Sequence, residues 1–140
     1  MENKYNAFLY PVARVLLSFI FIMSGVGKMG DWSGTAGYMA SHGFFAVPFF
    51  LAGAIFLEIA GGLSVLTGFK ARWGALALIV FLVPATLIFH AFWTLPAESM
   101  RMEMISFLKN ISILGGLLFV LANGAGSFSV DNRLSASGRK

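Results

Sequence analysis

The segment from Ala46 to Phe69 constrains the fold most, because it is almost wholly apolar and holds one ionisable side chain, Glu58. As a helix it is long enough to cross the hydrocarbon core of a bilayer at about 1.5 Å per residue. A carboxylate near the centre of such a span costs at least about 2.5 kcal/mol unless it is paired, hydrated or protonated. The sequence therefore predicts a partner for Glu58 elsewhere in the membrane-embedded part of the chain.

Three further apolar segments follow the same pattern, and each carries a basic or titratable group. Hydrophobic residues make up 58% of the chain and charged residues 11%, well below the roughly 25% charged residues of soluble domains. We therefore expect a single all-α domain over residues 1–140, an integral membrane four-helix bundle with polar side chains on its inner faces. The predicted spans are residues 8–27, 46–69, 73–93 and 105–122, followed by a flexible tail at about 124–140 that is rich in Ser, Gly and Asn.

The composition also excludes several classes of chemistry. The sequence contains no Cys, which removes disulfides, thiolate-bound metals and iron–sulfur clusters. Motifs for phosphate binding, zinc proteolysis and serine hydrolysis are missing. Glu58 and His90 differ in predicted depth and lack a third ligand, so no metal site is expected. The formal charge of +4 is spread over the span ends, which favours lipid headgroups over nucleic acid as partner.

The distribution of cations predicts the orientation. With both termini in the cytoplasm, that side of the membrane holds most of the basic residues, which agrees with the positive-inside rule. In this orientation Arg14 and Glu58 differ in depth by about one to two helical turns, so we expect them to form a buried pair. Lys28, His90 and Lys109 gather at the outer end. The cytoplasmic cations are Lys4, Lys70, Arg72, Arg133, Arg139 and Lys140.

Four segments in order and at matching spacing carry a resemblance to a known family. They are ARVLLSFIFIMSGVGKM at Ala13–Met29, LEIAGGLSVLTGFKAR at Leu57–Arg72, HAFW at His90–Trp93 and FLKNISILGGLLF at Phe107–Phe119. Together they resemble the DoxX/DoxD-like membrane proteins of bacteria. The resemblance implies a compact four-helix protein of the bacterial inner membrane. Its recurrent polar and glycine positions match Arg14, Gly25, Lys28, Glu58, Gly62, His90, Lys109 and Asn110.

The resemblance further implies a link to sulfur-dependent electron transfer into quinone, which makes quinone the candidate cofactor. A quinone site needs hydrogen-bond donors near a carbonyl oxygen and an apolar slot. The candidate ligand-binding residues are Lys28, His90, Lys109 and Asn110, with Phe89, Phe92 and Phe107 as the slot. In the structural alternative, Lys109 reaches toward the interface and His90 caps a hydrated helix end.

Three functions stay open at this stage. The one that the sequence favours is an accessory or assembly subunit of a quinone-linked membrane redox system. The alternatives are a quinone-binding oxidoreductase subunit, whose electron donor is a separate protein, and a small carrier or channel that uses Glu58. A pairing of Glu58 with Arg14 disfavours the carrier. The expected partners are the lipid bilayer, a membrane or redox protein, and a second copy of the chain.

Overall fold

The computed structural model describes residues 4–137 and contains helices but no strands over that range. Four helices are long and apolar enough to cross a membrane, so the prediction of an all-α membrane bundle is confirmed and the protein is a multi-pass membrane protein. In chain order the elements are α1 (Lys4–Gly30), α2 (Trp32–Ser41), α3 (Val47–Thr67), α4 (Ala71–Phe89), the 3-10 helix η1 (Phe92–Thr94), α5 (Ala97–Asn123) and α6 (Val130–Ser137). The four membrane helices are α1, α3, α4 and α5.

The helices extend beyond some of the predicted spans and stop short of others. Both α1 and α5 contain 27 residues, or about 40 Å of helix. The connection between the first two membrane helices contains α2. The helix begins at Asp31, whose Oδ1 accepts a hydrogen bond from the backbone N–H of Gly34 at 3.1 Å. This is the usual role of an N-cap carboxylate.

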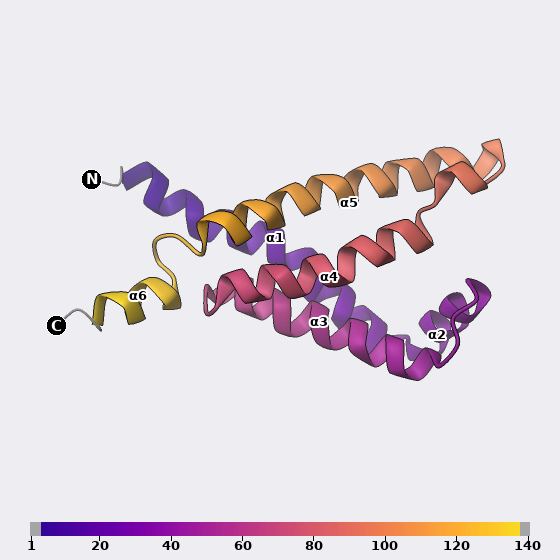
Figure 1. The fold of residues 1–140 in the computed structure, drawn as a ribbon, viewed down its shortest axis with the longest axis horizontal. Helices are drawn as coiled ribbons and strands as arrows, with labels where there is room; N and C mark the ends of the chain where they lie inside the picture. The colour runs from indigo at the N-terminus through magenta and orange to yellow at the C-terminus, as the bar shows by residue number, and fades with distance from the viewer. Residues whose placement is uncertain (1–3, 138–140) are drawn as a thin grey trace.

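The helices α3 and α4 form the centre of the bundle, with α1 against α3 and α5 against α4 (Figure 1). The start of α1 and the whole of α6 lie at one end of the molecule, and α2 lies at the other (Figure 1). Small residues set the close helix crossings, as in small-xxx-small packing. A Cβ on Gly62 would lie 2.7 Å from a side-chain atom of Ile22 on α1, and one on Gly61 would lie 3.1 Å from the carbonyl oxygen of Gly74 on α4. Gly62 thus allows α1 to approach α3 closely, and the adjacent Gly61 does the same for α4.

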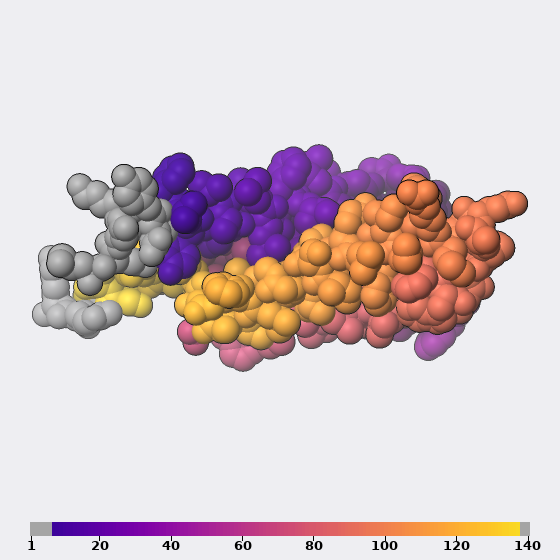
Figure 2. Space-filling model, turned by 90° about the horizontal axis from the view of Figure 1, so that it is seen from above, coloured from indigo at the N-terminus to yellow at the C-terminus, as the bar shows by residue number. Residues whose placement is uncertain are grey.

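The core is small and lies where α1, α3, α4 and α5 meet. Most other large apolar side chains are exposed, as expected for surfaces that face hydrocarbon. Leu117 is the one buried residue of α5, so this helix leaves its flank toward α1 incompletely closed. Figure 2 shows the side of the molecule on which α1 and α5 run beside each other. The buried apolar cluster consists of Phe21, Val65, Ala75, Leu78, Leu82 and Leu117.

The segment after α5 was expected to be flexible, and the structure corrects this for residues 124–137. Ser129 is buried, and the Asp131 carboxylate accepts hydrogen bonds from the backbone N–H groups of Lys70 and Ala71 at 2.8 and 3.1 Å. These N–H groups lie at the N-terminal end of α4, where backbone N–H groups have no acceptor within the helix. The polar composition therefore reflects capping of another helix rather than disorder. Residues 138–140 of the predicted tail lie outside the described residues.

Candidate functional site

Glu58 pairs with Lys28 inside the bundle. Glu58 is 1% exposed, and its Oε1 accepts a hydrogen bond from Lys28 Nζ at 2.9 Å. Lys28 Nζ also donates to Ser24 Oγ, one turn earlier on α1, at 2.6 Å. Glu58 Oε2 is buried and has no hydrogen-bond partner in the described part of the chain. Because buried polar atoms nearly always have a hydrogen-bond partner, an oxygen to which no donor is hydrogen-bonded is unusual.

The predicted pair between Arg14 and Glu58 is therefore wrong. Arg14 is buried, but its Nη2 donates to the carbonyl oxygen of Phe128 at 2.7 Å, at the other end of the bundle. Gly25 of α1 packs against Glu58, whereas Arg14 lies against Gly68. Glu58 and Gly68 are about ten residues apart on α3, which separates their depths by about 15 Å. Depths counted from the ends of the predicted spans favoured Arg14 as the partner of Glu58. The register of α1 against α3 places Lys28 there instead.

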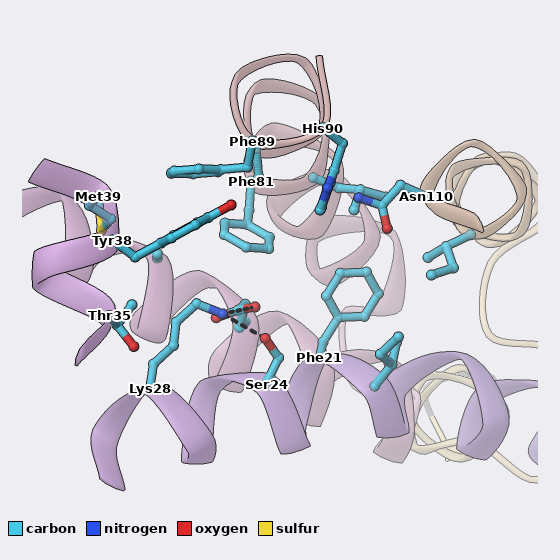
Figure 3. A pocket seen from close by; sticks show the side chains of 16 residues that line it. Phe21, Ser24, Lys28, Thr35, Tyr38, Met39, Phe81, Phe89, His90 and Asn110 are labelled. Carbon is cyan, nitrogen blue, oxygen red and sulfur yellow. Dashed lines mark hydrogen bonds and ion pairs between the residues drawn. The ribbon is translucent and has the colours of Figure 1, made fainter. Parts of the chain in front are cut away.

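The ion pair lines a cavity of about 280 Å³ between α1, α2, α3, α4 and α5. Figure 3 shows Lys28 and Ser24 on one side, Phe89 and His90 on the other, and the Tyr38 hydroxyl pointing into the space between them. Aromatic rings supply much of the wall. The full lining is Ile20, Phe21, Ser24, Lys28, Thr35, Tyr38, Met39, Ala54, Glu58, Phe81, Leu82, Ala85, Phe89, His90, Asn110 and Ile113.

Three of the four predicted ligand-binding residues lie at this cavity. Lys28 is one of them. His90 follows the end of α4 as its C-cap, and its Nδ1 lies 2.6 Å from Glu103 Oε2. Asn110 on α5 donates from Nδ2 to Thr86 Oγ1 at 2.9 Å. These bonds fix both side chains at the cavity wall.

Lys109 lies outside the cavity, in an adjoining groove of about 460 Å³ between α1 and α5. Its side chain is exposed, near the middle of α5, with Ser106 and Ser112 one turn away on either side. The groove and the cavity share four lining residues, so they adjoin along α5. The shared residues are Ile20, His90, Asn110 and Ile113.

Of the three aromatic residues predicted to form a slot, one lines the cavity. Phe89 lines the cavity and stacks on Tyr38, with ring centroids 5.4 Å apart. Phe92 and Phe107 are not part of the lining and pack edge to face against each other at 5.5 Å. Because α4 ends at Phe89, the chain turns at His90 and carries Phe92 away from the cavity. Sequence spacing along an uninterrupted helix cannot indicate this turn.

Tyr38 is the main site residue that the sequence did not identify. It lies on α2, in a connection between membrane helices, where Tyr and Trp commonly act as anchors at the headgroup level. Burial raises the pKa of the Tyr38 phenol above its usual value near 10, and the negative charge of Glu103 raises this pKa further. The hydroxyl therefore keeps its proton at neutral pH and can donate a hydrogen bond to a ligand.

Comparison with known proteins identifies the family. The family model described as DoxX matches residues 10–91. The chain belongs to the DoxX family. The DoxX match contains Lys28, Glu58 and His90, and ends before Asn110. The expected resemblance is thus confirmed, and most of the cavity lies in the part of the chain that defines this membership.

Two bacterial relatives match over most of their length. Inner membrane protein YqjF of Escherichia coli (strain K12) is 38% identical over 125 residues, 89% of this chain and 90% of the relative. Inner membrane protein YphA of the same organism is 32% identical, with 89% of each chain covered. A Surfeit locus protein 4 homolog of Schizosaccharomyces pombe is 29% identical over 94% of this chain, which spans 39% of that longer protein. No solved structure matches.

Proposed function

We propose that this DoxX-family protein is a quinone-binding subunit of a redox system in the bacterial inner membrane, with both termini in the cytoplasm. The observation that supports it is the cavity at the Lys28–Glu58 pair, which combines hydrogen-bond donors with aromatic walls and adjoins a lateral groove. The inner-membrane location rests on the names of the two bacterial relatives. The cytoplasmic termini rest on the positive-inside rule.

The cavity suits a single substituted ring. Its volume of about 280 Å³ lies just below the range of about 300–1,000 Å³ for small-molecule sites. A quinone carbonyl oxygen accepts hydrogen bonds, and the ammonium of Lys28 and the hydroxyl of Tyr38 are the donors that face this space (Figure 3). Phe81 and Phe89 supply aromatic surface against which the ring can stack.

The groove between α1 and α5 suits the apolar tail of such a ligand. It holds about 460 Å³, adjoins the cavity at His90 and Asn110, and lies on the exposed flank of the bundle. A ligand with its ring in the cavity can therefore extend its tail toward the lipid without crossing the α1–α3 contact. The site thus favours a lipid-soluble molecule over a water-soluble one.

The proposal places the electron partner in a separate protein. The chain has no Cys, and the described residues contain no group of three or more His, Cys, Asp or Glu that could hold a metal ion. Lys28, Tyr38 and Phe89 bind and orient the ring in this scheme, and the partner exchanges electrons with it. This is why a subunit, rather than a self-sufficient oxidoreductase, is proposed.

Thermal unfolding with added decylubiquinone tests the site. A ligand that binds the native state raises its apparent stability by RT ln(1 + [L]/Kd), about 2.7 kcal/mol at one hundred times Kd. We expect Phe89→Ala to reduce the shift and Phe92→Ala, an aromatic control outside the cavity, to leave it unchanged. A wild-type protein that shows no concentration-dependent shift would contradict the proposal.

A second candidate, the accessory or assembly subunit, is favoured by one separate observation. Lys109 is exposed on the membrane helix α5, and an unpaired charge that faces hydrocarbon is costly. A helix of another protein that brings a carboxylate to this face would lower that cost. A complex that depends on this contact should dissociate on native gels with Lys109→Ala and persist with Arg101→Ala, near the start of α5. A complex that survives both changes does not use this face.

A further inference from the structure

We infer that the ligand enters the cavity from the lipid, through the seam between α1 and α5, and that Ile20 and Ile113 form the gate. The seam is the line along which these two helices face each other (Figure 2). This inference rests on the proposed function and specifies how the ligand of that same site arrives. It requires a ligand that is dissolved in the membrane.

The other helix pairs around the cavity are closed by direct contacts. Between α1 and α3, a Cβ on Gly25 would lie 2.7 Å from a side-chain atom of Ile59. Between α3 and α4, the close approach at Gly61 leaves no room for a side chain. Between α4 and α5, Asn110 Nδ2 donates to Thr86 Oγ1 at 2.9 Å. A ligand that enters between any of these pairs has to separate packed helices or break a buried hydrogen bond.

The end of the cavity that faces α2 is covered by aromatic rings. Tyr38 stacks on Phe89 with ring centroids 5.4 Å apart, and Phe44 stacks on the same ring at 5.6 Å. His42 lies against Phe89 edge to face at 5.1 Å. The opposite end is bounded by Phe21, which belongs to the buried apolar cluster and lines the cavity. The seam between α1 and α5 is the side that remains.

The seam is packed at one level and open at the next. A Cβ on Gly116 would lie 3.2 Å from Leu17 Cδ1, so α1 and α5 meet there. The two helices run in opposite directions (Figure 1). Ile20, three residues after Leu17, therefore lies about one turn along the seam, at the level of Ile113. Both isoleucines line the cavity as well as the groove, so they stand between the two.

Little holds this gate shut. The helix α1 packs much more extensively on α3 than on α5, and Ile20 is 49% exposed. Isoleucine has no hydrogen-bonding group, so no polar atom loses a partner when the gate opens. Lipid chains are as apolar as the side chains of the gate, so contact with them carries no hydrophobic penalty. Opening the seam therefore costs less than opening any other side of the cavity.

A reducible cross-link across the gate tests the route. Because the chain has no Cys, the double variant Ile20→Cys and Ile113→Cys can be linked selectively with a short bis-methanethiosulfonate. Binding of tritiated decylubiquinone to the immobilised, detergent-solubilised full chain is followed by scintillation proximity. We expect the link to slow association at least about tenfold and reduction to restore it. Methyl methanethiosulfonate, which modifies both thiols without joining them, is the control and should leave association within about threefold of the unmodified variant.

A single substitution tests the gate without any link. Ile113→Phe narrows it and should slow association and release by similar factors, about fivefold, so that Kd changes by less than about threefold. Ile111→Phe is the matched control, because Ile111 is exposed on the same helix and lines neither the cavity nor the groove. This control should change neither rate.

The outcomes separate this inference from the proposed function. Association that is equally fast in the linked and the reduced double variant overturns the inference and leaves the quinone site standing. Should the double variant fail to fold, an Ile113→Phe protein with unchanged rates, or with a change in release alone, overturns it as well. Absence of decylubiquinone binding by the wild type overturns the proposed function and the inference with it.

Discussion

Removal of Lys28 should destabilise the protein because it strands the buried carboxylate of Glu58. At the observed 2.9 Å, two unit charges attract by about 6 kcal/mol at an effective dielectric constant near 20. Desolvation offsets part of this gross attraction, and breaking one member of a buried pair typically costs about 3–5 kcal/mol. The Lys28 side chain is 22% exposed, which allows some hydration. We therefore expect Lys28→Gln to lower the free energy of unfolding by about 3 kcal/mol.

A double-mutant cycle isolates the interaction itself. Glu58→Gln should cost less than Lys28→Gln, because the ammonium left behind is partly exposed and can reach hydrated surroundings. The double variant should lose at least about 1.5 kcal/mol less than the sum of the single losses, since no charge remains to be stranded. Denaturant unfolding in mixed detergent micelles, followed by the fluorescence of Trp32, Trp73 and Trp93, measures each free energy.

The matched control is Arg14 with Glu58, the buried pair that the sequence alone predicts. Arg14→Gln combined with Glu58→Gln should be additive within about 0.5 kcal/mol, because these residues lie about 15 Å apart in depth. Two results would refute the reasoning. One is additivity in the Lys28 and Glu58 cycle, and the other is coupling above about 1 kcal/mol between Arg14 and Glu58.

Three further predictions test the topology, the crossing of α3 and α4, and the C-terminal clamp, by which we mean the hydrogen bonds from the start of α4 to the Asp131 carboxylate. Reporter fusions should place the C-terminus in the cytoplasm and the connection between α2 and α3 outside, and an external C-terminus would reverse every assigned depth. Gly74→Ala should cost about 1–3 kcal/mol of unfolding free energy, because its Cβ would lie 2.9 Å from the carbonyl oxygen of Gly61; Gly53→Ala, which has open space around it, should be neutral or stabilising. Asp131→Ala should cost about 1 kcal/mol by removing the acceptor for two N–H groups at the start of α4, and an unchanged stability would show that the clamp contributes nothing.

The four membrane helices were predictable because hydrophobic length is encoded locally. Each span is a long apolar segment, and a bilayer leaves the helix as one of very few ways to satisfy the backbone. The polar faces were also predictable, since helical periodicity places Arg14 and Lys28 along one side of α1. The sequence also shows two adjacent glycines, Gly61 and Gly62, and both are sites of close helix approach in the structure.

Features that depend on distant segments were not predictable in this way. Asp131 reads as one acidic residue in a polar tail, and its role appears only when the α3–α4 turn is placed beside it. Tyr38 reads as an interfacial aromatic, and its position at the cavity depends on how α2 folds back toward Phe89. Local composition carries no information about either long-range contact.

The partner of Glu58 shows most clearly where sequence reasoning stops. Arg14 and Lys28 lie on the same face of α1, about four turns apart, so periodicity treats them as equivalent candidates for a carboxylate on a neighbouring helix. The choice between them depends on the register of α1 against α3. That register is set by close contacts such as Ile59 against Gly25 and Ile22 against Gly62, where two bulky side chains fit over two glycines. Once these contacts form, Lys28 reaches Glu58 and Arg14 is left to hold the C-terminal segment through Phe128. The glycine positions therefore determine which cation enters the cavity, and with it the hydrogen-bonding character of the site.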